Sequence, residues 1–158
     1  MIKIDSIDRR ILEELQLDAA RPVEQIASRV GLTQNPCWRR IKRLEAEGVI
    51  QRRVAIVDAA LLGVGLTVFV SIRTNQHNEA WLEKFAAGVR RIPEVVELYR
   101  MSGDTDYLLK VLARDVADYD RIYKQLIRTA ELHDVSSSFA MEQIKYTTEV
   151  PLRGVATD

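Results

Sequence analysis

The chain has 158 residues, of which 47% are hydrophobic and 29% are charged, and its formal net charge is zero. This composition excludes an intrinsically disordered chain, which combines few apolar residues with a large net charge. The length allows two small domains. The apolar stretches 54–57 and 61–70 are interrupted and fall short of the roughly 18 residues that span a bilayer, so no membrane segment is expected.

Three short helices are predicted in the first third of the chain. The first runs from about Ser6 to Leu17, the second lies between Pro22 and Gly31, and the third lies between Thr33 and Gly48. Proline and glycine mark these boundaries because proline disfavours a continuing helix and glycine adopts the left-handed conformation at a helix end. The apolar positions that share one side of each helix are Ile7, Ile11, Leu12, Leu15, Val23, Ile26, Ala27, Val30, Cys37, Ile41 and Leu44.

A domain boundary is predicted after these helices. Residues 49–57 have the pattern of a short strand or a linker, and Asp58, Gly63 and Gly65 supply turn chemistry. We therefore divide the chain into a helical domain at 1–53, a linker at 54–65 and a second domain at 66–158.

The second domain has the pattern of strands and helices in the order β-α-β-β-α-β. This order is typical of a ferredoxin-like sandwich with two helices on one sheet face. Apolar residues such as Phe69, Tyr99, Leu108 and Leu112 spread over both strand faces, so we expect the open face to be buried in a homodimer. The predicted strands are 66–74, 95–101, 107–113 and 135–146, and the predicted helices are 78–92 and 115–130.

The second and third helices match a helix-turn-helix that binds DNA. Ala27 allows close helix packing and Gly31 forms the turn. Residues 39–53 hold six cations against two carboxylates, a local net charge of +4 that suits phosphate contact. Glutamine and asparagine side chains bind adenine, and arginine binds guanine through two hydrogen bonds. The predicted DNA-binding residues are Gln34, Asn35, Trp38, Arg39, Lys42, Arg43, Arg52 and Arg53.

The alternative to DNA binding is that the charges of the third helix only face solvent on one side of an amphipathic helix, and that Trp38 is a packing residue. The overall fold class is nevertheless α+β, an N-terminal helix-turn-helix (winged-helix-like) domain followed by a ferredoxin-like βαββαβ domain, with double-stranded DNA as a partner.

Several separate motifs resemble the leucine-responsive/asparagine-regulator family, also called Lrp/AsnC or feast/famine transcriptional regulators. The motifs are IDRRIL at 7–12, IASRVGLT at 26–33 with Pro36-Cys37, RIKRLE at 40–45 with Gly48-Val49-Ile50, and GDTDY at 103–107. The resemblance covers nearly the whole chain. The ending at 137–148, together with Cys37-Trp38, resembles the subgroup of cysteine-responsive regulators that govern cysteine detoxification.

The resemblance implies a small amino-acid effector, with L-cysteine as the candidate, bound at a seam between dimers that assemble into tetramers or octamers. Glycine frees loop amides to hold a carboxylate, aspartate pairs with an ammonium group, and serine hydroxyls orient a polar side chain. A hairpin turn beside a polar edge strand is the alternative interpretation. The effector-binding residues expected from the resemblance are Met101, Ser102, Gly103, Asp104, Asp106, Tyr107, Ser136, Ser137 and Ser138.

Other functions stay open at this point. Siroheme decarboxylases share the two-domain plan, but His77 and His133 are the only histidines and suit solvated turns better than tetrapyrrole chemistry. No catalytic set, metal-ligand motif or cofactor motif stands out. A metabolite-binding assembly module without DNA binding is a third reading, which the retained cations oppose. The single cysteine and the absence of a secretory signal pattern favour the cytoplasm.

Overall fold

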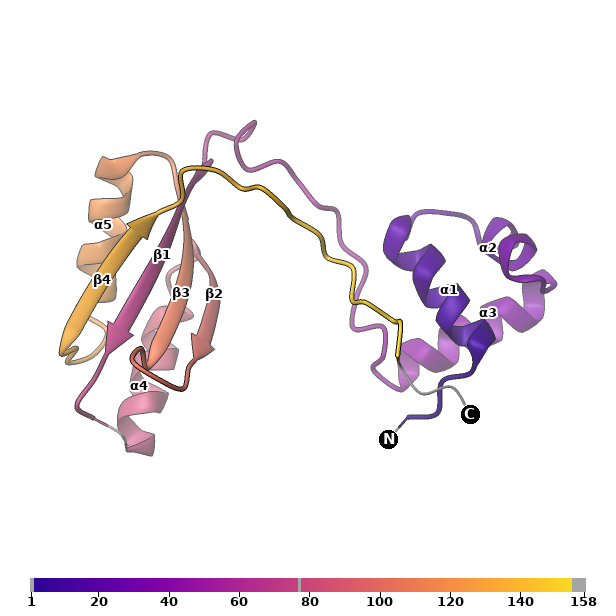
Figure 1. The fold of residues 1–158 in the computed structure, drawn as a ribbon, viewed down its shortest axis with the longest axis horizontal. Helices are drawn as coiled ribbons and strands as arrows, with labels where there is room; N and C mark the ends of the chain where they lie inside the picture. The colour runs from indigo at the N-terminus through magenta and orange to yellow at the C-terminus, as the bar shows by residue number, and fades with distance from the viewer. Residues whose placement is uncertain (1, 77, 155–158) are drawn as a thin grey trace. The chain divides into compact units, whose positions relative to one another are not determined.

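The computed structural model describes residues 2–76 and 78–154. They form two compact units (Figure 1). The first unit holds the described residues up to Ile56 together with those from Lys145 onward, and the second unit is Val57–Ile144. Within residues 2–76 and 78–154, no helix is long and apolar enough to cross a membrane.

Three helices build the first unit: α1 (Ser6–Leu17), α2 (Val23–Val30) and α3 (Gln34–Ala46). Their bounds confirm the predicted helices. The apolar positions predicted to share a core are buried: Ile11, Leu12, Leu15, Ile26, Ala27, Val30, Cys37, Ile41 and Leu44. The helical spacing of these residues places them on one side of each helix, and these sides pack together in the core. Helices this short depend on such a buried apolar side for their stability.

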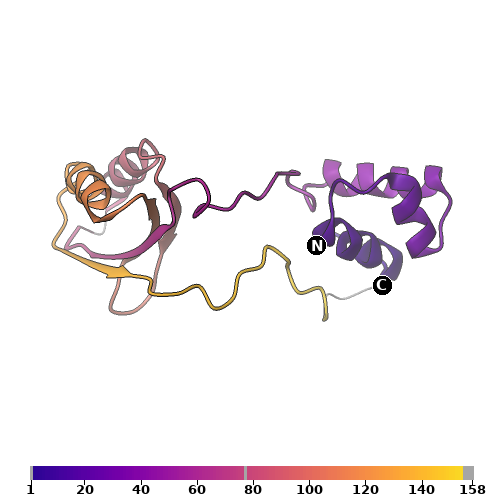
Figure 2. The same cartoon turned by 90° about the horizontal axis from the view of Figure 1, so that it is seen from above.

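The second unit is a four-stranded antiparallel sheet with the order β2-β3-β1-β4. Both helices cover the same sheet face (Figure 2), as predicted for a ferredoxin-like sandwich. The elements are β1 (Leu66–Arg73), α4 (Glu79–Val89), β2 (Val95–Arg100), β3 (Tyr107–Ala113), α5 (Val116–Leu126) and β4 (Asp134–Phe139).

The core of the second unit lies between the sheet and the two helices. Alternate residues of β1 and β3 point into it, as the period of two along a strand requires. Trp81 and Phe85 of α4 stack with ring centroids 5.0 Å apart, and Tyr107 of β3 packs 5.1 Å from Phe85. The same alternation leaves Phe69 40% exposed on the open sheet face.

Some predicted elements extend beyond the elements that the structure shows. The last strand was predicted to continue to Tyr146, but β4 ends at Phe139, where its pairing with Val68 of β1 ends. In the described residues 47–65 no strand forms, so the linker interpretation of 49–57 holds and the winged element is missing there. By contacts, the described residues from Lys145 onward group with the helical unit, where Leu152 packs against the core, whereas the sequence interpretation assigned 66–158 to the second domain.

Candidate nucleic-acid interface and ligand site

The turn between α2 and α3 is fixed by backbone hydrogen bonds. Gly31 ends α2 with φ 77°, a left-handed conformation that other residues rarely adopt. The Leu32 amide donates to the Ala27 carbonyl at 2.9 Å. Arg10 of α1 donates to the Arg29 carbonyl at 2.6 Å and to the Val30 carbonyl at 3.3 Å, so it occupies the free carbonyls at the end of α2. Contacts from α1, from the end of α2 and from the turn itself therefore determine the direction in which α3 leaves the turn.

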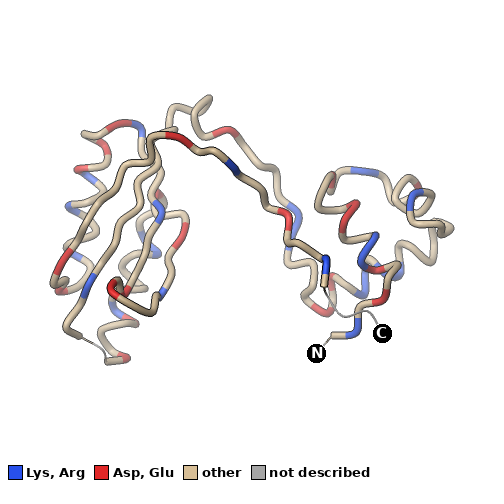
Figure 3. The backbone as a smooth tube through the Cα atoms, viewed as in Figure 1, with Lys and Arg blue, Asp and Glu red and all other residues tan. Residues whose placement is uncertain are grey.

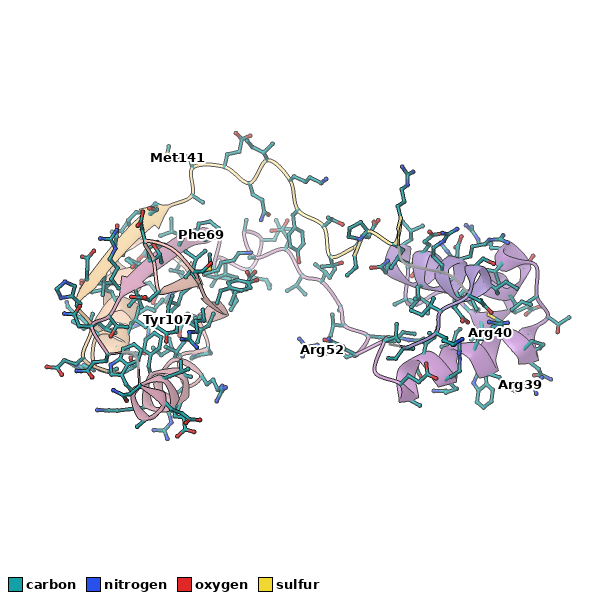
Figure 4. The ribbon with its side chains drawn as sticks, turned by 60° about the horizontal axis from the view of Figure 1, so that its bottom comes forward. Arg39, Arg40, Arg52, Phe69, Tyr107 and Met141 are labelled. Carbon is teal, nitrogen blue, oxygen red and sulfur yellow. The ribbon has the colours of Figure 1, made fainter. Side chains whose placement is uncertain are left out.

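One side of α3 is open to solvent. Its buried side consists of Cys37, Ile41 and Leu44, at the expected helical spacing. Figure 4 shows Arg39 on the outer side of the helix. Half of the Trp38 surface is exposed, so this side chain is free to contact another molecule. The other predicted DNA-binding residues of α3 that are exposed are Gln34, Asn35, Arg39 and Lys42.

Two arginines of α3 point instead toward α1. Arg40 contacts Asp5 at 2.6 Å and Asp8 at 2.8 Å, and Arg43 also pairs with Asp8. Asp8 is only 1% exposed. Burial raises the pKa of Asp5, but the Asp8 amide and Arg40 outweigh it and hold this pKa below its usual value. Arg43, predicted to bind DNA, is thus engaged within the protein, and we call Asp5, Asp8, Arg40 and Arg43 the α1–α3 ion-pair network.

Glu45 neutralises two further predicted DNA-binding cations. Lys42 lies 2.8 Å and Arg53 2.9 Å from its carboxylate. The hydrogen bond from Lys42 is the main reason that the pKa of Glu45 is lowered. Both pairs are exposed enough for phosphate to replace the carboxylate at modest cost. Among the residues that the structure describes, no ion pair involves Arg39 or the exposed Arg52 of the linker.

A hollow of about 440 Å³ lies at the start of α3. It is lined by Asp5, Pro36, Arg39, Arg40 and Arg43. Figure 3 shows acidic and basic positions close together on the helical unit, so its charge is mixed rather than uniformly basic. The helix-turn-helix geometry suits contact with DNA, because Arg39 of α3 and Arg52 after it have no ion pair among the described residues.

The α1–α3 network was not predicted. Asp5 and Asp8 form a capping box, in which the Asp8 amide donates to Asp5 at 2.7 Å and the Asp5 amide donates to Asp8 at 3.2 Å. Two acids three residues apart at a helix start are a readable capping signal. Their pairing with arginines 32 and 35 residues away depends on the tertiary fold, so the chain sequence alone does not reveal it.

The predicted effector loop is a hairpin turn between β2 and β3. The Met101 amide donates to the Asp106 carbonyl at 2.8 Å, and the Asp106 carboxylate accepts from the Thr74 amide at 2.8 Å. Gly103 has φ 114°, which permits the turn. Asp106 therefore holds the loop to the end of β1, whereas Asp104 is exposed and has no such bond among the described residues.

The other predicted effector residues divide between the two sheet faces. Ser137 bonds to Tyr119 of α5, and Tyr107 lies in the helix-side core (Figure 4). Ser136 and Ser138 are exposed on the open face. Since β1 separates β4 from β3, these serines lie about 10 Å from the β3 backbone. The loop lies at the end of the sheet where β3 begins, whereas Ser138 pairs with Phe69 in the middle of β1, so the loop and the serines do not converge on one pocket in the described part of a single chain.

The histidines offer little support for enzyme chemistry. His133 is exposed, and its Nδ1 lies 3.1 Å from the Asn75 amide nitrogen. His77, the other candidate, lies outside the described residues. Across residues 2–76 and 78–154, no group of three or more histidine, cysteine or acidic side chains is arranged to hold a metal ion.

Comparison with known families gives two matches along the chain. Residues 4–45 match the AsnC-type helix-turn-helix domain, and residues 67–150 match the Lrp/AsnC ligand binding domain. The second match alone spans more than half of the chain.

Comparison with individual proteins agrees. The chain is 46% identical to the glutamate uptake regulatory protein of Zymomonas mobilis, over 95% of this chain and 92% of that protein. It is 45% identical to the DNA-binding transcriptional activator DecR of Escherichia coli, over 94% and 99%. An AsnC family transcriptional regulator from Agrobacterium tumefaciens superposes with a TM-score of 0.92 at 55% identity, over 95% and 98%. A transcriptional regulator from Neisseria meningitidis, solved as a complex with L-Met, gives 0.91 at 30%, over 98% and 100%.

Proposed function

The chain belongs to the Lrp/AsnC family of DNA-binding transcriptional regulators that respond to amino acids, and we propose that it binds a palindromic operator as a dimer under the control of L-cysteine. The single observation that carries the DNA-binding part is the exposed side of α3. It presents Gln34, Asn35, Trp38 and Arg39 beside a turn that three elements hold in place. Because its ligand is DNA, we expect the protein to work in the cytoplasm with the chromosome.

Two arginines distinguish base reading from backbone contact. We propose that Arg39 contacts a base edge in the major groove and that Arg52 contacts phosphate. Arg39→Ala should weaken binding to an operator selected from random duplexes by roughly 1 to 3 kcal/mol and flatten the base preference at one position. Arg52→Ala should weaken operator and random DNA equally. Equal loss on both DNAs for Arg39→Ala would refute its base-reading role.

The open sheet face supports the proposed dimer. Phe69 and Tyr99 are 40% and 50% exposed there, and exposed apolar patches mark interaction sites. Lys110 contacts Glu97 at 3.2 Å, and Tyr99 donates to Glu97 at 2.8 Å, so these three polar side chains already have partners when the face is buried. A two-fold dimer would present two α3 helices to half-sites about one helical turn apart or a multiple of it. Further assembly to a tetramer or octamer is part of the same proposal.

The effector site is proposed at the Gly103 loop and the start of β4, completed by a second dimer. The loop and the serines do not form a pocket within the described part of one chain, which favours a site between subunits. The L-Met complex of the Neisseria relative supports an amino-acid ligand. L-cysteine is our candidate because residues 137–148 resemble the cysteine-responsive subgroup.

Calorimetry with each of the twenty amino acids tests this site. We expect L-cysteine to bind, and Asp104→Ala and Ser138→Ala to reduce its effect on operator binding while effector-free DNA binding stays intact. An effector acts only through different affinities for two states, typically about 1 to 3 kcal/mol. If no amino acid binds, or if both variants respond like the parent, the site is wrongly placed and the second unit is left with an assembly role.

An enzyme remains the alternative of a different class. The curated relatives named above are transcriptional regulators, and exposed His133 in the described part of the chain contacts only Asn75 among the hydrogen bonds seen. We therefore propose no catalytic activity and no metal or organic cofactor. A tetrapyrrole absorbance band in the purified protein would overturn this.

A further inference from the structure

The C-terminal segment 147–153 lies against the solvent side of α1, although it follows β4 in the chain (Figure 1). The Val150 amide donates to the Gln16 side-chain oxygen at 2.6 Å, and the Gln16 side-chain nitrogen donates to the Val150 carbonyl at 3.2 Å. This reciprocal pair satisfies both polar groups of one backbone residue, as a β-ladder pair does. It therefore fixes where the segment sits along the helix.

Apolar and charged groups extend the contact on both sides of Gln16. Leu152 is half-buried and packs against the core of the helical unit. A hollow of about 590 Å³ between helix and segment is lined by Glu13 and Leu17 from α1 and by Lys145 and Arg153 from the other side. The charges that line this hollow are Glu13 on the helix and Lys145, Glu149 and Arg153 on the other side, so the segment side carries one more basic than acidic group.

We propose that this side of α1 is the docking surface for the chain's own C-terminal segment, and that docking orients the DNA-binding unit. The chain passes between the two units twice, once after α3 and once after β4. A unit held by one flexible linker samples many orientations, and a second attachment removes part of this freedom before DNA binds. Binding of two half-sites depends on this orientation, whereas binding of one half-site does not.

The inference rests on the proposed function for its regulatory meaning. The segment emerges from β4, which carries Ser136 and Ser138 of the proposed effector site. A ligand that shifts β4 would also shift the start of the segment that follows it, and would thereby change the orientation of α3 through the docked contact. Docking itself does not depend on the identity of the effector, so it is testable separately.

The first measurement is hydrogen exchange of the Val150 amide in the full-length protein by NMR. In the parent this amide should be protected, and Gln16→Ala should speed its exchange about 2- to 10-fold, because one hydrogen bond is worth about 0.5 to 1.5 kcal/mol. Gln143→Ala is the matched control, since Gln143 is exposed and lies before the docked segment. An unprotected Val150 amide in the parent would overturn the docking.

The second measurement compares a selected full operator with its isolated half-site. Gln16→Ala/Leu152→Ser should weaken full-site binding on the order of tenfold and leave half-site binding unchanged, because α3 is untouched. Gln16→Ala alone serves if the double variant fails to fold. Equal full-site affinity in variant and parent would refute the orienting role. Absence of sequence-selective DNA binding in the parent would instead contradict the proposed function, while the exchange result still decides the docking.

A mixed dimer identifies the occupant. One protomer carries Gln16→Ala with its own segment, and the other carries an intact Gln16 but ends before Thr147. If each segment docks on its own α1, neither protomer has the contact and full-site affinity stays low. Recovery of the lost protection at the single Val150 amide of the mixed dimer would show that the segment docks on a second copy, and would overturn the proposal.

Discussion

The α1–α3 ion-pair network makes a prediction about Asp8. Asp8→Asn keeps the shape of the side chain and removes its charge, so Arg40 and Arg43 lose their shared partner. Removing one member of a fully buried pair costs about 3 to 5 kcal/mol. Here the arginines are 30% and 40% exposed and can turn to water, and Arg40 keeps Asp5 at 2.6 Å. We therefore expect a loss of about 2 kcal/mol from the helical unit, the range of a hydrogen bond to a charged group.

Denaturant unfolding measures this loss if the two units are observed separately. Trp38 lies in the helical unit and Trp81 in the other, so Trp81→Phe leaves a fluorescence reporter of the helical unit alone. Glu13→Gln is the control, because it removes one negative charge from α1 at an exposed pair with Arg9. Exposed pairs are worth about 0 to 1 kcal/mol. Equal midpoints for Asp8→Asn and Glu13→Gln would refute the reasoning.

DNA binding gives an independent readout of the same change. Released arginines become available to phosphate, so the slope of log affinity against log salt should steepen by about 0.9 for each new contact. Since α3 is held less firmly, the ratio of operator to random-DNA affinity should fall at the same time. A variant that merely destabilised the helix would lose affinity without a steeper slope.

Three further predictions concern the core, the acid range and the dimer face. Ile41→Ala should destabilise the helical unit by about 2 to 5 kcal/mol, measured by the same Trp38 fluorescence, because Ile41 is 1% exposed. The hydrogen bond from Arg114 holds the pKa of Asp118 far below its usual value. The ionised Asp118 therefore stabilises the second unit above a pH of about 4, and this stabilisation is lost as the pH falls below that. Asp118→Asn should reduce the dependence of the melting temperature of the second unit on pH in this acid range. Lys110→Glu should shift the protein toward monomer in sedimentation, because two acids would then be buried side by side, and adding Glu97→Lys should restore the dimer.

The helices and the order of elements along the chain were predictable because each depends on local patterns. The spacing of Ile11, Ile41 and Leu44 determines which sides of α1 and α3 face the core, and the alternation along β3 determines its buried face. Edge strands are harder, because the end of β4 depends on how far β1 extends beside it. The segment after Lys145 has no helical or strand period, so its place on α1 had no signal in the sequence.

The candidate sites were predicted only in part because side-chain direction depends on tertiary contacts. Arg39 and Arg43 are both cations on the recognition helix, but α1 places a buried carboxylate beside Arg43 and none of the described carboxylates beside Arg39. The three serines are consecutive, yet the strand period sends Ser137 to the helix side and Ser136 and Ser138 to the open face. The sequence gives the residue types of a site, whereas tertiary contacts decide which of these side chains are available to bind a ligand.

The small number of unpaired cations explains why assembly is a suitable point of control. With Arg39 assigned to a base edge and Arg52 to phosphate, a dimer offers about two phosphate contacts from these positions, and each contributes about 0.9 to the salt slope. Under the proposed function, such a unit should bind DNA weakly by itself, and its affinity for an operator should come from presenting two units at the correct spacing. A ligand that changes how units are assembled or oriented then changes operator occupancy without touching α3. A strongly basic unit would stay on DNA in either state, so the acids that occupy Arg40 and Arg43 leave the protein open to control by its effector.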